Sequence, residues 1–349
     1  MTKSSIGSPG KSGPPLLRLA HVMAFMAYLR RLGAPVGGYL RRSGLPTMCE
    51  DPDAYVPVLR IWSFFDTAAR NDDSELGWRV VEHVGDHQLN AGLLRKFESA
   101  PSLLQALRRF VQLVKTEATG LEIGLEERRD RILIYSRYSS LTGEPGYDVS
   151  EAYRLGIFLD LIRHFLGPQW VPDEIGLESK HVPSGAKACF PGSRFLTQQP
   201  AGYIAVPRSC LHRNLAVSDA KVGRAENPLL NDISPLLSEN PDYLSLLQVV
   251  LKAYIPEGYV SQRHAAELMN TSIRTLTRRL SAHHLTYGEL IDGMRFNAAK
   301  KLLRNPDMRI GDVAQSVGFK EQGDFTRMFR RVSGLCPKEF RNSAVRYSA

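Results

Sequence analysis

At 349 residues the chain is long enough for two ordinary domains, each with its own hydrophobic core. Hydrophobic residues make up 43% and charged residues 23%, which excludes a mainly disordered chain. The net charge of +9 is unevenly placed, because residues 243–349 hold 17 Lys and Arg against 9 Asp and Glu. The C-terminal third is therefore expected to face a polyanion, although charge alone leaves open a solvated basic surface without a partner.

The four cysteines are far apart and form no Cys-x-x-Cys pair, which argues against a zinc site and a disulfide framework. They are Cys49, Cys189, Cys210 and Cys336. The N-terminus has no signal sequence, and no apolar run approaches the length of a membrane span. These features predict a cytoplasmic protein with no membrane partner.

Residues 1–15 are too poor in apolar groups to fold and are expected to form a disordered tail. The next two hundred residues mix two kinds of hydrophobic pattern. Helical periodicity covers residues 16–32, 55–70, 102–115 and 149–166, and strand alternation covers 121–125, 131–135, 174–177 and 203–206. Residues 121–135 read as a hairpin. The order of these elements predicts an α+β domain over residues 16–215 rather than a wound parallel sheet.

Residues 216–242 are polar and contain Pro228, Pro235 and Pro241, which predicts a linker between domains. From residue 243 to 349 the periodicity is helical almost throughout. The predicted architecture is therefore an α+β domain followed by an all-α domain.

Within the all-α domain, residues 262–268 and 272–281 are expected to form a helix-turn-helix unit around a turn at 269–271. Asn270 suits a left-handed turn position, and Ser272 or Thr271 can cap the second helix. Ile273, Leu276 and Leu280 share one face of that helix and are expected to pack inward. Arg274 and Arg278 fall on the opposite face, where a recognition helix meets the major groove.

A second unit follows about fifty residues later. Val313 and Ala314 belong to the apolar stripe of its first helix, which Gly318 ends, and Phe325 and Phe329 anchor its second helix. Residues 287–304 can form a connecting helix about 27 Å long at the usual rise of ~1.5 Å per residue. The two reading helices are then expected to lie near one DNA turn apart, about 34 Å, and to enter two successive major grooves.

The second unit resembles the C-terminal signature of the AraC/XylS family. Residues 310–341 read IGDVAQSVGFKEQGDFTRMFRRVSGLCPKEFR, with the markers Val313, Ala314, Gly318, Phe319, Phe325, Arg327, Phe329, Arg330, Gly334, Pro337, Phe340 and Arg341. Residues 272–280, SIRTLTRRL, resemble the first unit of one subgroup, and residues 55–135 and 190–195 are similar to its arabinose-binding-domain-like sensor.

The resemblance implies a transcription regulator, expected to be an activator, that binds double-stranded DNA. It further implies RNA polymerase as a partner and a small-molecule effector in the N-terminal domain, and it leaves a homodimer open. We expect no cofactor and no metal. No residue pattern identifies the effector or the residues that bind it.

The two reading helices supply the candidate site residues. Those expected to read bases are Arg274, Thr277, Arg278, Gln322, Asp324 and Arg327. Those expected to contact phosphate are Ser272, Thr275, Arg279, Lys320, Thr326 and Arg330. Gly323 departs from the family pattern, which usually has a side chain able to touch DNA there. The second unit is therefore expected either to read fewer bases than the first or to allow closer approach of its backbone to DNA.

The competing hypothesis is an enzyme that its C-terminal domain delivers to DNA. The sequence offers no nucleophile with a base, no phosphate loop and no metal cluster, so a regulator without catalytic activity is preferred. His83 and His87 lie one helical turn apart but lack a third ligand. Cys336 is interpreted as a buried core residue, and Trp62, Trp78 and Trp170 as core rather than a ligand box.

Overall fold

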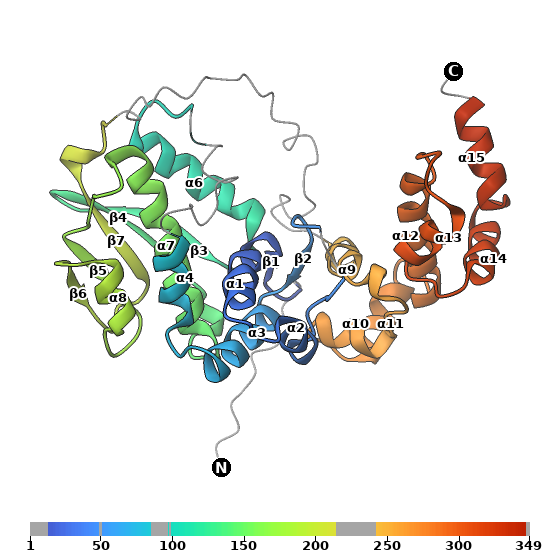
Figure 1. Ribbon diagram of the computed structural model, residues 1–349, viewed down its shortest axis with the longest axis horizontal. Coiled ribbons are helices and arrows are strands. Elements are labelled where there is room, and N and C mark those ends of the chain that lie inside the picture. Colours follow the sequence, from blue (N-terminus) through green and yellow to red (C-terminus); the bar gives the residue numbers. More distant parts are fainter. Residues whose placement is uncertain (1–12, 49–50, 85–96, 98, 214–241, 347–349) are drawn as a thin grey trace, which may run out of the picture. The chain divides into compact units, whose positions relative to one another are not determined.

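The computed structural model describes residues 13–48, 51–84, 97, 99–213 and 242–346 (Figure 1). Contacts between residues divide these into two compact units. The N-terminal unit takes in residues 15–45 and the described residues from 58 to 213. The C-terminal unit takes in residues 242–346 together with 13–14 and the described residues of 46–57. Most of the predicted tail, nearly all of the predicted linker and His87 lie outside the described residues.

Seven helices described in the N-terminal unit surround a small sheet. They are α1 (Ala20–Arg31), α2 (Val36–Ser43), α3 (Val58–Asn71), α4 (Leu76–Val84), α6 (Leu103–Glu117), α7 (Tyr147–Leu166) and α8 (Ser184–Cys189). The strands are β1 (Leu16–Arg18), β3 (Glu122–Glu127), β4 (Arg131–Arg137), β5 (Glu174–Gly176), β6 (Arg194–Leu196) and β7 (Gly202–Pro207). Short 3-10 turns follow β4 (Ser139–Leu141) and β7 (Arg208–Cys210).

Five of these strands form one mixed sheet in the order β3-β4-β7-β5-β6. The β3–β4 hairpin is antiparallel, as are the pairs β4–β7 and β5–β7, whereas β5 and β6 run parallel. Ile134 of β4 and Ile175 of β5 both pair with Ile204 of the central strand β7. In Figure 1 the helices α6 and α7 lie beside this sheet, and they contact β3, β4 and β7. The predicted α+β fold and the predicted hairpin are therefore confirmed.

The core of this unit is built around α7. Most of the α7 side chains are buried on all sides, which is the pattern of a central rather than a surface helix. Trp62 and Trp78 are buried, as the core interpretation requires, and Trp170 is partly buried. Gly77 of α4 allows close contact with α7, because a Cβ there would lie 2.7 Å from the Cβ of Ala152.

Two helices begin later than their hydrophobic periodicity predicts. Residues 16–18 form a strand instead of the first helical turn, because Leu16 exchanges hydrogen bonds of 2.8 Å with the backbone and hydroxyl of Thr119. This pairing with a residue about a hundred positions away overrides the local pattern. The helix predicted from residue 55 begins at Val58, because Pro57 holds the residue before it in an extended conformation.

The C-terminal unit is helical, as predicted, apart from the three-residue strand β2 (Tyr55–Pro57). Its helices are α9 (Tyr243–Lys252), α10 (Gln262–Leu268), α11 (Ile273–Ser281), α12 (Tyr287–Leu302), α13 (Ile310–Ser316), α14 (Gln322–Ser333) and α15 (Pro337–Arg346), with a 3-10 turn at Ile255–Glu257. Side chains cap four of the helices: Asp242, Ser261, Ser272 and Thr286 each accept a hydrogen bond from a backbone N–H.

Candidate nucleic-acid interface

The first helix-turn-helix unit is formed by α10 and α11. Asn270 takes the left-handed conformation between them, with φ 47°, and the Ser272 hydroxyl caps α11 by accepting from the Thr275 N–H at 3.2 Å. Leu276 and Leu280 are fully buried on the inner side of α11. These features confirm the predicted turn, the predicted cap and most of the predicted inner face.

Ile273 contradicts that prediction, because it is 40% exposed. It is the first residue of α11, and helical side chains lean toward the N-terminus of their helix. Its side chain therefore points beyond the end of α11 rather than against a neighbouring helix. The helical spacing places Ile273 at the angle of the inner face, but spacing does not show that the residue lies at the end of the helix.

The outward face of α11 carries Arg274, Thr277 and Arg278, all exposed. In the described part of the chain, neither Arg274 nor Arg278 has a hydrogen bond or ion pair through its guanidinium. The Thr277 hydroxyl donates to the Ile273 carbonyl at 2.9 Å and accepts from the Gln262 amide at 2.8 Å. The two arginines are thus free to meet a ligand, whereas Thr277 already has partners.

Arg279 lies at the side of this face. Its guanidinium stacks on the ring of Tyr243 in α9, 4.1 Å from the ring centroid, and the side chain is half-buried. Thr275, also half-buried, has its hydroxyl 3.0 Å from that of Ser272. The sequence could not reveal the Arg279 contact, because it depends on how α9 packs against α11.

The second unit is formed by α13 and α14. Gly318 ends the predicted stripe with φ 81°, as expected of a left-handed helix terminus. Phe325 and Phe329 are fully buried and pack with Val313 and Ala314, which confirms the predicted core. Cys336 is only half-buried, so its interpretation as a buried core residue is wrong: it precedes α15, where its N–H donates to Glu339 at 2.8 Å.

The outward face of α14 carries Gln322, Gly323, Asp324, Arg327 and Arg330, all exposed. Arg327 forms an ion pair with Asp324 one helical turn earlier, and the two side chains remain 77% and 53% exposed. Thr326 is half-buried and donates to the Gln322 carbonyl, and Lys320 is exposed just before the helix.

Two further arginines hold this unit together and were not singled out in the sequence. Arg331 of α14 forms an ion pair with Asp292 of α12. Arg295 of α12 is 5% exposed and lies over the ring of Phe319, 4.5 Å from its centroid. Burial lowers the pKa of Arg295, while its side chain donates to the Gly318 carbonyl at 3.4 Å. Arg295 thus ties the connecting helix to the turn of the second unit.

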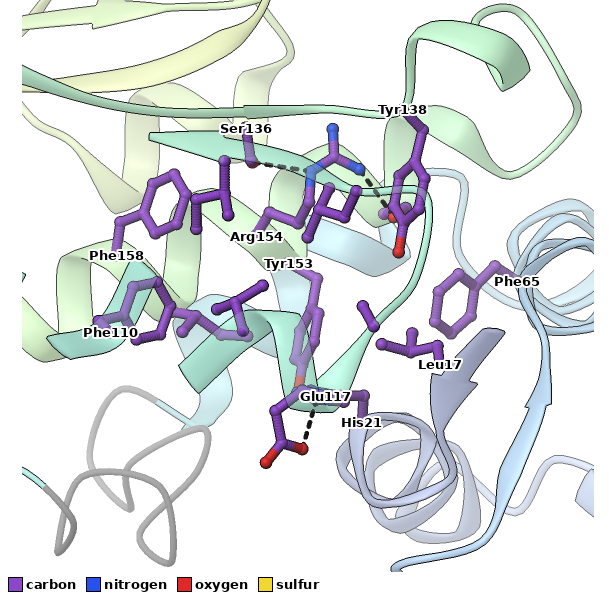
Figure 2. A pocket seen from close by; sticks show the side chains of 16 residues that line it. Leu17, His21, Phe65, Phe110, Glu117, Ser136, Tyr138, Tyr153, Arg154 and Phe158 are labelled. Atoms are coloured by element: carbon purple, nitrogen blue, oxygen red, sulfur yellow. Dashed lines mark hydrogen bonds and ion pairs between the residues drawn. The ribbon is translucent and has the colours of Figure 1, made fainter. Parts of the chain in front are cut away.

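The N-terminal unit contains a cavity enclosed by α1, α3, α6, α7 and the strands β1, β3 and β4 (Figure 2). Its wall is mostly apolar, with Phe65, Phe110 and Phe158 among the side chains that line it. Figure 2 shows Arg154 and Ser136 on one side, and His21 with Glu117 on the other. All of these residues belong to one unit, so the cavity is a property of the N-terminal unit alone.

In the described residues, no group of three or more His, Cys, Asp or Glu side chains is placed to hold a metal ion. No helix of the described chain is long and apolar enough to cross a bilayer. Together, the two helix-turn-helix units and their outward arginines define a DNA-binding protein with a separate α+β unit.

Comparison with known proteins gives the family. Residues 33–215 match the model of the arabinose-binding N-terminal domain of AraC transcription regulators, and residues 265–343 match a helix-turn-helix domain model. Because these matches cover most of the chain, the protein belongs to the AraC family of DNA-binding transcription regulators.

Among its relatives, the transcriptional regulator VqsM of Pseudomonas aeruginosa is 22% identical over 88% of this chain and 96% of its own length. VirS of Mycobacterium tuberculosis is 24% identical over 93% of this chain and 96% of its own. The transcriptional activator RhaS of an Enterobacter strain is 33% identical over 30% of this chain and 38% of its own length.

Proposed function

We propose that this regulator activates transcription, and that a small molecule bound by its N-terminal unit controls how the C-terminal unit engages DNA and RNA polymerase. The observation that carries the proposal is the pair of helices α11 and α14. Each helix buries one face within its helix-turn-helix unit and presents arginines on the opposite face. The net charge of +8 over residues 243–349 supports contact with a polyanion.

We assign the roles on DNA by the chemistry of each side chain. Arg274, Arg278 and Arg327 would read guanine through two N–H groups, with Thr277, Gln322 and Asp324 as further base contacts. Ser272, Thr275, Arg279, Lys320, Thr326 and Arg330 would contact phosphate and set the position of the two helices in successive major grooves. The stacking of Arg279 on Tyr243 would fix its guanidinium in one direction before DNA binds.

For the domain organisation, we propose a sensor over residues 16–215, a linker over 216–242 and a DNA-binding domain over 243–349. The protein would act in the cytoplasm, where bacterial promoters lie. Control by an effector would be a shift between two arrangements with different affinity for DNA or polymerase. The activator RhaS, similar over 30% of this chain, supports the proposed direction of control.

The experiment is genome-wide mapping of bound sites in cells that produce the full chain, with transcript levels of the neighbouring genes. We expect discrete sites with a two-part sequence, and lower transcription of nearby genes when the protein is removed. An Arg274→Ala, Arg278→Ala double variant should lose most of these sites. Higher transcription on removal would refute the activator role, and absence of discrete sites would refute specific DNA reading.

A catalytic N-terminal unit is the competing proposal. It predicts that a molecule which stabilises the protein is also converted by it. We expect such a molecule to be recovered unchanged after incubation with the full-length protein, as judged by mass spectrometry. Conversion with turnover would establish an enzyme.

A further inference from the structure

We propose that the cavity in the N-terminal unit binds a compact carboxylic acid. Its carboxylate would be held by Arg154, Ser136 and Ser150, and its apolar part would lie among the aromatic side chains of the wall (Figure 2). This inference rests on the proposed function, because it names the binding site and the chemical class of the effector.

The polar end at Arg154 has an excess of hydrogen-bond donors. Arg154 donates through Nε to the Ser136 hydroxyl at 3.1 Å and through Nη1 to the Ser150 hydroxyl at 2.9 Å. Each hydroxyl accepts one hydrogen bond from Arg154 and keeps its own O–H to donate, together with a second lone pair. Among the described residues, neither O–H has an acceptor within hydrogen-bond distance. Counted with the remaining N–H groups of Arg154, the donors at this end outnumber the acceptors, so it suits a ligand that brings acceptors, and a carboxylate brings the strongest.

Arg154 is also held in a fixed position before any ligand binds. Its guanidinium lies 5.5 Å from the ring centroid of Tyr138 and 5.3 Å from that of Tyr147, and Nη2 donates to Glu178 at 3.3 Å. Three of its five N–H groups therefore have partners, which leaves two for a ligand. A guanidinium with such neighbours loses little conformational freedom when it binds an anion.

The negative charge near Arg154 is smaller than the number of carboxyl groups suggests. Glu178 accepts not only from Arg154 but also from the Tyr147 hydroxyl at 2.5 Å. Burial raises the pKa of the neighbouring Glu151 to about 7, so this group is partly protonated near neutral pH. A second anion beside Arg154 would therefore meet less repulsion than two full negative charges would cause.

The opposite side of the cavity gives the ligand its direction. Glu117 forms an ion pair with Arg18 at 2.7 Å and lies 3.5 Å from His21, whose Nδ1 is 3.1 Å from the Tyr153 hydroxyl. Figure 2 shows this acidic group across the cavity from Arg154. This side carries a carboxylate that Arg18 already pairs, whereas Arg154 keeps N–H groups for a ligand, so a carboxylate would turn toward Arg154 and leave its apolar part near Phe110 and Phe158.

The size of the cavity limits the ligand. Its volume is about 50 Å³, enough for roughly three to five water molecules and less than the ~150 Å³ of a cavity that accepts benzene. Acetate or propanoate, each smaller than benzene, comes closest to this space, whereas a longer acid requires the surrounding helices to separate.

The first experiment uses the full-length protein and a set of matched probes. Thermal unfolding is followed with acetate, propanoate, butanoate and hexanoate, and with propanamide, propanol and propylamine, all at one ionic strength. We expect a short carboxylate, at about ten times its Kd, to raise Tm by about 3–6 °C, and the uncharged and cationic analogues to do so much less. Equal shifts with acid and amide would overturn the carboxylate assignment. Failure of all the carboxylates to shift Tm would overturn the cavity as their site.

The second experiment tests the residues by calorimetric titration with the best carboxylate. Arg154→Lys keeps the charge opposite Glu178 but loses the planar group, and we expect at least tenfold weaker binding. Arg163→Lys is the matched control: it lies on the same helix, its Nε donates to the Trp170 carbonyl at 2.9 Å, and it does not line the cavity. Equal losses in the two variants would overturn the role of Arg154.

Two further measurements keep the result interpretable. If Arg154→Lys does not fold, Ala118→Leu, which fills the cavity from the end of α6, should abolish binding of the carboxylate while the protein still unfolds cooperatively. DNA binding of every variant is measured separately without the acid. If the protein binds DNA but carboxylates have no effect on it, the carboxylate is refuted as the ligand and the proposed function as a regulator stands. If the unmodified protein shows no specific DNA binding, the proposed function is refuted instead.

Discussion

At the scale of single residues, the arginines of the two reading helices differ in what holds them before DNA arrives. Arg274 and Arg278 are exposed without a partner among the described residues, whereas Arg327 is paired with Asp324. Arg279 is stacked on Tyr243. The sequence predicted which side of each helix these residues occupy, but their contacts depend on neighbours that only the folded chain provides.

Arginines that read bases should be separable from basic residues that touch phosphate. Replacing Arg278 or Arg327 with Ala should cost about 1–3 kcal/mol on the cognate site and relax the preference at one base pair. Replacing Lys320 or Arg330 should weaken cognate and scrambled DNA alike and reduce the salt slope by about one. Titrations on both DNAs at several salt concentrations decide between these roles. Equal losses on both DNAs for Arg278→Ala and Arg327→Ala would contradict the assignment.

The exposed Ile273 leads to a second prediction at this scale. A branched apolar side chain at the start of a reading helix can contact the methyl group of thymine. Ile273→Ala should therefore weaken binding by about 1 kcal/mol on a site that has thymine in its first half. The variant should also bind equally well when that thymine is replaced by uracil, which lacks the methyl group. Val332→Ala, also exposed but near the end of α14, is the control. If Ile273→Ala keeps the same ratio of affinities for thymine and uracil DNA as the unmodified protein, Ile273 does not contact the methyl group.

At the scale of elements, the turn before α14 depends on a glycine. Gly318 has φ 81°, and a Cβ there would lie 2.3 Å from the Ile255 carbonyl oxygen. Gly318→Ala should destabilise the C-terminal unit by roughly 2–4 kcal/mol, from the left-handed conformation and the clash together. Gly293→Ala, in the middle of α12 with open space around it, should instead stabilise by up to about 1 kcal/mol. Chemical unfolding of both variants measures the difference, and similar stabilities would contradict this account of the turn.

Helices with a strong apolar stripe and a capping residue were predicted well. The bounds of α10 and α11 and the Ser272 cap follow from local chemistry that the sequence contains. Helix α2 was not predicted, because Gly37 and Gly38 near its start have low helix propensity. The strands β1 and β6 depend on pairing with distant residues, which local periodicity cannot indicate.

The binding sites divide in the same way. The reading faces follow from the spacing of arginines on a helix, so their residues could be named from the sequence. The cavity is lined by residues from Leu17 to Phe158, drawn from helices and strands far apart in the chain. Arg154 and Ser150 lie one turn apart on α7, but Ser136 joins them only through the packing of α7 on β4. No spacing of residues in the sequence predicts that Ser136 and Arg154 line one cavity.

At the scale of the whole molecule, DNA binding should reside in the C-terminal residues alone. A fragment of residues 240–349 should fold and bind DNA, because it contains both helix-turn-helix units, the core around Phe325 and Phe329, and 17 Lys and Arg against 10 Asp and Glu. It loses residues 46–57, which contribute an exposed Lys252–Asp51 ion pair at 3.2 Å and hydrogen bonds to Glu257. An exposed pair is worth at most about 1 kcal/mol. The fragment also loses the buried strand β2, which contacts α9, so it should fold with lower stability than the intact chain.

Circular dichroism and binding at low salt test this prediction, with the Arg274→Ala, Arg278→Ala form of the same fragment as the control. A folded fragment that does not bind DNA even at low salt would show that the domain boundary is wrong.

The pairing of Arg327 with Asp324 has a consequence for how the regulator responds to its ionic surroundings. Helix α11 holds three arginines and no acidic residue, whereas two of the three arginines of α14 are in ion pairs with Asp324 and Asp292. Fewer counterions should therefore leave the DNA when α14 enters its groove than when α11 does. Added salt should weaken the first half-site more, so the sequence preference itself should change with ionic strength. Binding sites can be selected from random DNA at low and at high salt. At high salt the sequence preference should weaken more in the first half-site than in the second. A uniform loss across both half-sites would show that the two helices are electrostatically equivalent.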